Sequence, residues 1–249
     1  MRMSGRSALL VRFFVFATVA LTGFTQHASA VTLDSVSHIH HVKVVENKLF
    51  VLTHEGLYEL VGKNNMKLVG KDRFDVMGFT TLGKALFASG HPAEGSKMPN
   101  PIGLVKSIDG GLTWKAVSLV GKVDFHFLEG AGSDLYGSDS QSGNLMHSPD
   151  SGKTWKYLGT NTFTDIAVSP KMPGMAIAIK GSELLLTKNA FKATTKIKNT
   201  LKITQIEWRK SGLYAVSGKT LFKSINSGKT WTKLNTFKGA LGILSASDQ

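Results

Sequence analysis

Short apolar runs recur along the chain, and glycine, asparagine and lysine residues separate them. Five of these runs are rich in β-branched and aromatic residues or alternate between apolar and polar positions, as strands do. They are Lys48–Thr53, Lys84–Ala88, Asp134–Gly137, Met175–Ile179 and Gly212–Val216. Each has one apolar stretch before it and another after it, and no long helical periodicity interrupts the series. The pattern predicts an all-β chain.

An eight-residue motif occurs three times between such runs. Its copies share Ser, Asp or Asn, Gly, Thr and Trp at the same places. They consist of Ser107, Asp109, Gly111, Thr113 and Trp114; Ser148, Asp150, Gly152, Thr154 and Trp155; and Ser224, Asn226, Gly228, Thr230 and Trp231. The first two copies begin 41 residues apart, and the next interval, 76 residues, is about two such periods. A degenerate copy is therefore expected midway, where Thr187-Lys188-Asn189 follows an apolar run. A fixed period of this length indicates a repeat architecture.

Each copy suits a tight connection between two antiparallel strands. The Asp or Asn side chain is placed to accept hydrogen bonds from N–H groups of its own turn. The glycine permits a positive φ, and the tryptophan begins the next strand, where it can cover apolar surface between sheets. Nothing in the motif requires a ligand, so we interpret it as structural.

Grouping the strands by this period gives five units of four strands. The units are 36–70, 73–118, 122–159, 162–198 and 202–235. Four strands in about 40–45 residues are typical of a β-propeller blade. We therefore expect a β-propeller of about five four-stranded blades, with six as the alternative. Residues 239–245 are expected to be either the remnant of a sixth blade or a strand that closes the ring against the first unit.

The three motifs resemble the Asp-box, or BNR, repeat of sialidases, sortilin-type receptors and the photosystem II assembly factor, which are all β-propellers. Further segments resemble a group of secreted bacterial Asp-box propellers labelled glycosylhydrolase-like. These segments are His38–His40, Thr53–Tyr58, Met77–Phe79, Ser89–Pro92, Pro99–Pro101 and Asp124–His126. In the Asp-box family the motifs lie at the periphery of the blades. The resemblance therefore implies the fold much more than an activity.

Residues 1–30 are arranged like a secretory signal peptide. They contain three arginines and no acidic residue, an apolar run over Phe13–Leu21, and the small residues Ala28–Ala30. The apolar run is shorter than the roughly 20 residues that a membrane-spanning helix needs. We expect cleavage after Ala30, export to the periplasm or the medium, and a propeller domain over 31–249 without a transmembrane segment. A buried N-terminal helix is the alternative.

The formal charge of +13 does not indicate nucleic-acid binding. Three of the positive charges fall within the predicted signal peptide, which leaves +10, carried almost wholly by dispersed lysines. Beyond that segment the only arginines are Arg73 and Arg209. Specific nucleic-acid recognition uses arginines or stacked aromatic residues, so we expect no nucleic-acid partner. A sialidase holds its substrate carboxylate with three arginines, so this activity is excluded as well. The absence of cysteine excludes disulfides and thiolate chemistry.

Propeller ligands usually enter at the central channel, so binding residues are expected on the first strand of each unit. The predicted inner strands are Val36–Val44, Asp75–Thr80, Val123–Leu128, Thr162–Val168 and Ile203–Trp208. Histidine and aspartate gather on them, and two further histidines, His54 and His91, fall where the second strand of a unit ends or turns. The candidate ligand-binding residues are His38, His40, Asp75, His91, His126 and Asp165. Neutral imidazoles and carboxylates suit Cu or Zn, and the candidate metal ligands are His38, His40 and His126. The alternative is a water-filled channel lined by polar residues.

The sequence thus predicts an exported, monomeric binding or assembly module without a catalytic role. Its expected partner is a protein or a small polar or glycan ligand, and a divalent transition metal is the expected cofactor if there is one. The alternative is a glycoside hydrolase other than a sialidase. That chemistry needs two carboxyl groups roughly 5–10 Å apart, for which Asp75, Asp124 and Asp165 are candidates.

Overall fold

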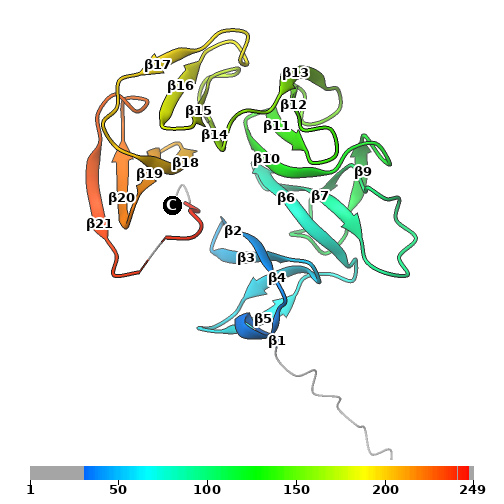
Figure 1. Cartoon of the computed structure of the whole chain (residues 1–249). Helices are drawn as coiled ribbons and strands as arrows, with labels where there is room; N and C mark the ends of the chain where they lie inside the picture. The colour runs from blue at the N-terminus through cyan, green and yellow to red at the C-terminus, as the bar shows by residue number, and fades with distance from the viewer. Residues whose placement is uncertain (1–30, 240, 247–249) are drawn as a thin grey trace, which may run out of the picture.

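Five antiparallel sheets surround a central axis in the computed structural model, which describes residues 31–239 and 241–246 (Figure 1). Four sheets have four strands, and the first has five. The predicted all-β propeller with five blades is therefore confirmed. The predicted signal peptide over residues 1–30 lies outside the described residues, so the predicted domain boundary stays a prediction. In the described part of the chain, no helix has the length and apolar character needed to cross a membrane.

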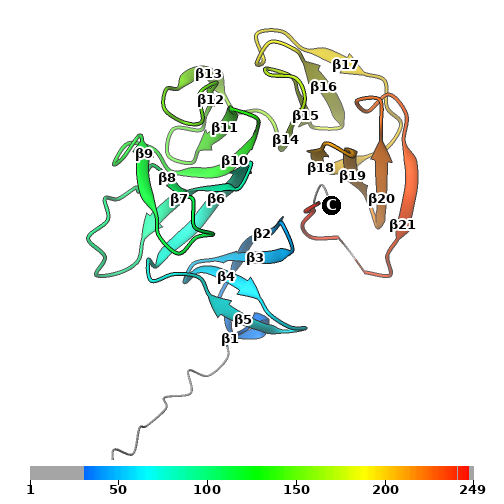
Figure 2. The same ribbon diagram turned by 180° about the vertical axis from the view of Figure 1, so that it is seen from behind.

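Each blade is built from consecutive strands, so blades 1 to 5 follow the order of the chain, as the view from behind also shows (Figure 2). Blade 1 contains β1 (Val31–Thr32), β2 (Ile39–Val45), β3 (Lys48–Thr53), β4 (Gly56–Leu60) and β5 (Asn65–Leu68); blade 2 contains β6 (Phe74–Leu82), β7 (Ala85–Pro92), β8 (Leu104–Ser107) and β9 (Lys115–Ser118); blade 3 contains β10 (Phe125–Ala131), β11 (Asp134–Asp139), β12 (Asn144–Ser148) and β13 (Lys156–Thr160); blade 4 contains β14 (Asp165–Val168), β15 (Ala176–Lys180), β16 (Glu183–Thr187) and β17 (Thr195–Ile197); blade 5 contains β18 (Ile203–Arg209), β19 (Gly212–Ser217), β20 (Thr220–Ser224) and β21 (Thr232–Thr236).

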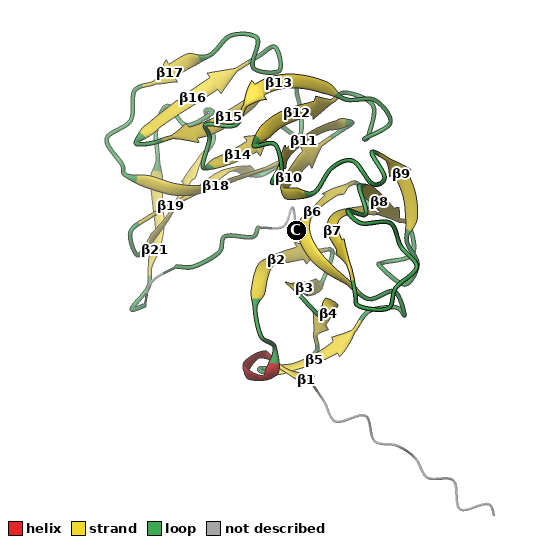
Figure 3. Cartoon of the chain, turned by 45° about the vertical axis from the view of Figure 1, so that its right-hand side comes forward, coloured by secondary structure: helices red, strands yellow, loops and turns green. Residues whose placement is uncertain are grey.

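In every blade the chain runs outward from the channel. The inner strands are β2, β6, β10, β14 and β18, as predicted, and each is followed by three strands that pair in sequence. Blade 1 differs from the expected unit because it begins at Val31 rather than residue 36. There β1 pairs with the outer strand β5, and the short 3₁₀ turn η1 (Leu33–Ser35) leads from β1 towards β2 (Figure 3).

The apolar core is divided into clusters that lie between neighbouring blades. Four clusters join blades 1 and 2, 2 and 3, 3 and 4, and 4 and 5. The fifth contains residues of blade 1 alone, including Val51, Tyr58 and Met66. Each fully buried aliphatic or aromatic side chain contributes about 1.5–3 kcal/mol, so the four shared clusters hold neighbouring blades together. No apolar cluster of the described residues joins blade 5 to blade 1, so that junction depends on other contacts.

The three repeated motifs lie between the third and fourth strands of blades 2, 3 and 5. In the first copy, Ser107 Oγ accepts the N–H of Gly111 at 2.8 Å, and Asp109 Oδ1 accepts the N–H of Thr113 at 3.0 Å. The other two copies have the same bonds. The hydrogen bonds from Thr113 hold the pKa of Asp109 down at about 2. Each tryptophan packs against a cluster between two blades.

The degenerate copy in blade 4 forms the same loop without the glycine and the tryptophan. Thr187 Oγ1 accepts the N–H of Phe191 at 2.9 Å, and Asn189 Oδ1 accepts the N–H of Ala193 at 2.9 Å. Phe191 has a φ of +62° where the other copies have glycine. Its ring packs against the cluster between blades 3 and 4, so a blade-interface contact is kept although the tryptophan is missing.

The segment after β21 corrects both expectations for residues 239–245. It is neither the remnant of a sixth blade nor a strand, because none of its described residues pairs in a sheet. Instead, residues 241–246, called the tail below, return from the outside of blade 5 to the channel and lie between β18 and β2 (Figures 1 and 3). Two glycines and the lack of alternation explain why the segment does not continue a sheet.

Candidate functional site

The inner strands all begin at the same end of the channel, which is called the rim below. Each blade repeats the same outward path, so its inner strand runs in the same direction along the axis. This arrangement places His40, Asp75 and His126 near the starts of β2, β6 and β10. The antiparallel partners reach the rim too: Ile39 pairs with Thr53, which precedes His54, and Asp75 pairs with His91.

Two imidazoles surround Asp75 at the junction of blades 1 and 2; His40, His54 and Asp75 are called cluster A. His40 Nε2 lies 2.9 Å from Asp75 Oδ1, and His54 Nδ1 lies 2.7 Å from Asp75 Oδ2. The two imidazole nitrogens are 3.2 Å apart. Each of these two nitrogens carries at most one hydrogen. The three close contacts therefore cannot all be hydrogen bonds at the same time. The ligand atoms lie close enough together to hold one metal ion.

A second, matching group lies at the junction of blades 2 and 3; His91, Asp124 and His126 are called cluster B. Asp124 is 1% exposed, and its Oδ2 lies 3.0 Å from His91 Nε2 and 2.7 Å from His126 Nε2. The same oxygen accepts the hydroxyl of Ser140, while Oδ1 is buried without a hydrogen-bond partner. A buried carboxylate oxygen without a partner is costly unless a cation or another donor reaches it.

The hydrogen bond from His91 to Asn100 determines what cluster B offers. His91 Nδ1 lies 2.9 Å from Asn100 Oδ1, an oxygen that only accepts, so Nδ1 carries the hydrogen. In the neutral ring, Nε2 then presents a lone pair to the Asp124 carboxylate. Two acceptors at this distance repel each other unless a proton or a metal ion lies between them. A histidine that donates its other N–H to an oxygen is also the usual arrangement of a metal ligand.

The structure sorts the sequence candidates differently from the expected metal set of His38, His40 and His126. His40 and His126 fall in separate clusters, and His54 takes the place beside His40 that was expected for His38. The His38 ring centroid lies 5.0 Å from that of His40 and 5.3 Å from that of His54, next to cluster A but outside its ligand group. Asp165 belongs to neither cluster. Metal binding itself stays a prediction.

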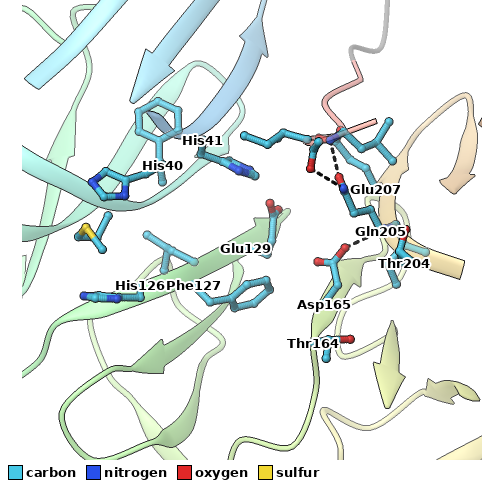
Figure 4. A pocket seen from close by; sticks show the side chains of 17 residues that line it. His40, His41, His126, Phe127, Glu129, Thr164, Asp165, Thr204, Gln205 and Glu207 are labelled. Atoms are coloured by element: carbon cyan, nitrogen blue, oxygen red, sulfur yellow. Dashed lines mark hydrogen bonds between the residues drawn. The ribbon is translucent and has the colours of Figure 1, made fainter. Parts of the chain in front are cut away.

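A cavity of about 250 Å³ lies in the channel below these residues (Figure 4). His40 and His126 line it, together with Met77, Asp165, Gln205 and residues 242–244 of the tail. Burial, and then the nearby Lys43, lower the pKa of His41, another lining residue, to about 4. Burial also lowers the pKa of His40 although Asp75 raises it, so its imidazole stays neutral over a wider pH range. The neutral imidazole is the form that binds a metal ion.

Sequence reasoning missed a group of charged side chains in the channel wall. Lys43 of β2 is 1% exposed, and its Nζ lies 2.9 Å from Glu129 Oε1 of β10 and 3.0 Å from Glu207 Oε1 of β18. Arg209 also forms an ion pair with Glu207. The signal for this group was a lysine in the middle of the apolar run around Val42 and Val44. These ion pairs connect blades 1, 3 and 5.

The buried carboxyl group of Asp165 should make the free energy of unfolding depend on pH. Burial of its carboxyl group raises the pKa to about 7, although the N–H of Ile206, 2.8 Å from Oδ2, favours ionisation. Between about pH 4 and pH 7 the folded chain therefore keeps a proton on Asp165 that the unfolded chain releases. The free energy of unfolding falls as pH rises through this window, by up to about 1.4 kcal/mol per pH unit. Asp165→Asn is expected to remove this contribution.

The measurement is urea unfolding of the wild type and Asp165→Asn at several pH values between 4.5 and 7. The wild-type stability relative to the variant should fall as pH rises. The difference cancels other titrating groups, including His41, whose lowered pKa changes stability in the opposite direction. A difference that does not change with pH would contradict the protonated state of Asp165.

Comparison with known proteins extends only to the fold. No family model and no curated protein matches the chain. Solved structures do match it. A chain of the nidogen/laminin complex has a TM-score of 0.56 at 9% identity, with 82% of this chain and 81% of that chain covered. PorZ, a surface component of the type IX secretion system of Porphyromonas gingivalis, has a TM-score of 0.52 at 13% identity. The match covers 81% of this chain and 28% of PorZ. The Pan2 WD40 domain of Neurospora crassa has a TM-score of 0.52 at 8% identity, and the match covers 81% of this chain and 66% of that domain's chain.

This chain is a β-propeller. At these identities the likeness concerns the fold alone, and the chain spans only 28% of PorZ. One fold can carry many functions, so the function has to be argued from the side chains of this chain and not from the likeness.

Proposed function

We propose that the propeller is an exported, non-catalytic binding module that holds divalent transition metal ions, Cu or Zn, at the rim of its channel. Clusters A and B are the two sites. The observation that carries the proposal is the place of His91, whose Nδ1 lies 2.9 Å from Asn100 Oδ1 while its Nε2 lies 3.0 Å from the buried carboxylate of Asp124. A metal ion between Nε2 and the carboxylate replaces their repulsion with two bonds and gives the buried Asp124 carboxylate a positive partner.

Two of the distances within the clusters support the same proposal. Bonds of about 2.0–2.1 Å at tetrahedral angles place two ligand atoms about 3.3 Å apart. The His40 and His54 nitrogens are 3.2 Å apart, and His91 Nε2 is 3.0 Å from its carboxylate oxygen. Two nitrogens and one carboxylate would fill three of the four positions of a tetrahedral site. Such a site suits Zn or Cu, and Met77 in the cavity adds a soft sulfur that suits Cu.

The test is metal uptake by the purified chain without its first 30 residues. After treatment with a chelator, it is titrated with Zn²⁺ and Cu²⁺ by calorimetry, and bound metal is counted by elemental analysis. We expect two equivalents per chain. His91→Gln with His126→Gln should leave one equivalent, His40→Gln with His54→Gln should also leave one, and the fourfold variant should bind none.

His147 offers a matched control. Its Nε2 lies 2.7 Å from Asp134 Oδ1, a buried pair with a single imidazole outside both clusters. His147→Gln should therefore keep both equivalents. Asn100→Ala should weaken binding at cluster B by about 10–100-fold, because it removes the acceptor that orients His91. A folded wild-type chain that takes up neither metal would overturn the proposal.

The repeated loops are proposed to be Asp-box repeats that serve the fold alone. Their hydrogen bonds close within each loop, as between Asp109 and Thr113, and their tryptophans are used in packing. They lie at the outer strands, away from the rim, so they leave the channel as the functional surface.

One observation favours the glycoside hydrolase as a second candidate. Asp165, which keeps a proton near neutral pH, has the state that a general acid needs, and Glu129 lines the same cavity. Against this role, Glu129 is paired with Lys43, and Asp165 accepts backbone N–H groups on both oxygens. The candidate requires turnover of an aryl glycoside that is lost in Asp165→Asn. No turnover over a broad substrate panel would exclude it.

A further inference from the structure

Four hydrogen bonds join the tail to the ring, and three of them use the main chain of the tail. The amide of Gln205 donates to the carbonyl of Gly242 at 2.6 Å and accepts the N–H of Leu244 at 2.6 Å. Glu207 accepts the N–H of Ala246, and the N–H of Val44 donates to the Ser245 hydroxyl at 2.9 Å. Three of the four contacts therefore use groups that every residue except proline offers.

The place that the tail occupies is a gap in the propeller. Blades 5 and 1 share no apolar cluster among the described residues, whereas every other neighbouring pair does. The Lys43–Glu207 ion pair crosses this gap, and the tail lies in it between β18 and β2 (Figure 1). The part of the gap that holds the tail is called the groove below. It is bounded by Val44 on one side and by Gln205 and Glu207 on the other.

We propose that this groove is a binding site for an extended peptide segment of a partner protein, and that the tail is an internal occupant which the segment displaces. Gln205 forms hydrogen bonds with a carbonyl and an N–H group of an extended main chain. Such main-chain bonds give affinity that depends little on the sequence of the segment. The segment would have small or aliphatic side chains, as in Gly242-Ile243-Leu244. It would have no proline at the positions of Leu244 and Ala246, which must donate an N–H.

The tail is held weakly enough to exchange. Each hydrogen bond contributes about 0.5–1.5 kcal/mol net, while ordering each backbone residue costs about 1–2 kcal/mol. Ile243 is 36% exposed, and Leu241 and Leu244 are half-buried, so none of the three aliphatic side chains of the tail is fully buried. The tail competes mainly because it is tethered, which gives it an effective concentration in the millimolar range. Removing it should therefore raise the apparent affinity for a free peptide.

The experiment compares the full chain with a chain that ends at Gly239. The probe is the hexapeptide of residues 241–246, acetylated and amidated, and binding is followed by NMR. We expect the shortened chain to bind it at least about 10-fold more tightly than the full chain. Gln205→Ala in the shortened chain should abolish binding. So should a probe that is N-methylated at the residues corresponding to Leu244 and Ala246, because it lacks both N–H donors. Replacing the three aliphatic side chains of the probe, those of Leu241, Ile243 and Leu244, by alanine should change affinity much less.

Three outcomes would overturn the proposal. A folded shortened chain that ignores the hexapeptide would show that the groove does not accept a peptide in trans. A shortened chain that does not fold would make the tail a structural part of the ring. A full chain that dimerises by exchanging tails would make a second copy the occupant. None of these results concerns clusters A and B, so metal uptake and peptide binding are tested separately.

Discussion

Replacing Lys43 with methionine is expected to lower the free energy of unfolding by about 3–5 kcal/mol. The side chain is almost fully buried, and its amine is shared by the carboxylates of Glu129 and Glu207. Burial alone would lower the pKa of Lys43, but the two carboxylates raise it, so the amine stays charged. Methionine would fill much of the same space without the charge. The carboxylates would then lose their shared cation in a site that water hardly reaches. Urea unfolding at pH 7 measures the loss.

Lys48→Met is the matched control. Lys48 also pairs with a glutamate, since its Nζ lies 2.9 Å from Glu59 Oε2, but its side chain is 56% exposed. A pair in contact with water contributes little, so this variant should lose less than about 1 kcal/mol. Adding Glu129→Gln to Lys43→Met should restore part of the stability, because one unpaired charge is removed with its partner. Equal losses for Lys43→Met and Lys48→Met would show that the buried ion pairs do not hold the ring together.

The sequence predicts the propeller because its signals are local. The alternation of each strand and the turn chemistry of the motif around Asp109 can be read without knowledge of neighbouring blades, and the 41-residue period gives the number of blades. Blade 4, with its degenerate copy at Thr187, is still placed correctly because the period spans it. The inner strands follow from the same argument, since they are the first strand of every unit.

The grouping of the rim residues could not be predicted, because it depends on contacts between blades. Their positions at the starts of inner strands place His40, Asp75 and His126 at the rim. These positions do not tell which carboxylate each imidazole contacts. His54 joins cluster A only because the turn after β3 lies beside blade 2. His91 reaches across to Asp124 of blade 3 although it pairs with Asp75 in its own blade. Such contacts depend on blade spacing and side-chain reach.

The tail was predicted as a strand or a blade remnant for a similar reason. Its apolar residues suggested pairing, but its described residues pair with neither β18 nor β2, the inner strands on its two sides. Gln205 and Glu207 satisfy its main chain instead, and they lie about 40 residues before it in the sequence. A side-chain contact with a backbone group so far along the chain leaves no local pattern.

Replacing Gly90 with alanine is expected to lower the free energy of unfolding by at least about 3 kcal/mol, through backbone strain and overpacking together. Gly90 has a φ of +147°, and an added Cβ would lie 1.9 Å from the carbonyl oxygen of Asp75. The strand cannot move aside easily. Gly90 pairs with Val76, and its own carbonyl accepts the N–H of Ile102 at 3.1 Å. Urea unfolding again measures the loss.

Gly83→Ala is the matched control, because it has the cost of a positive φ without the steric clash. Gly83 has a φ of +60°, but nothing lies within 4 Å of an added Cβ, so its replacement should cost about 1 kcal/mol. Similar losses for the two variants would contradict the close approach of β7 to β6. Gly90→Ala should also disturb the rim, because Gly90 immediately precedes His91 and lies against Asp75. Since Asp75 belongs to cluster A and His91 to cluster B, a shift between β6 and β7 should reduce metal uptake at both sites, whereas Gly83→Ala should leave it unchanged.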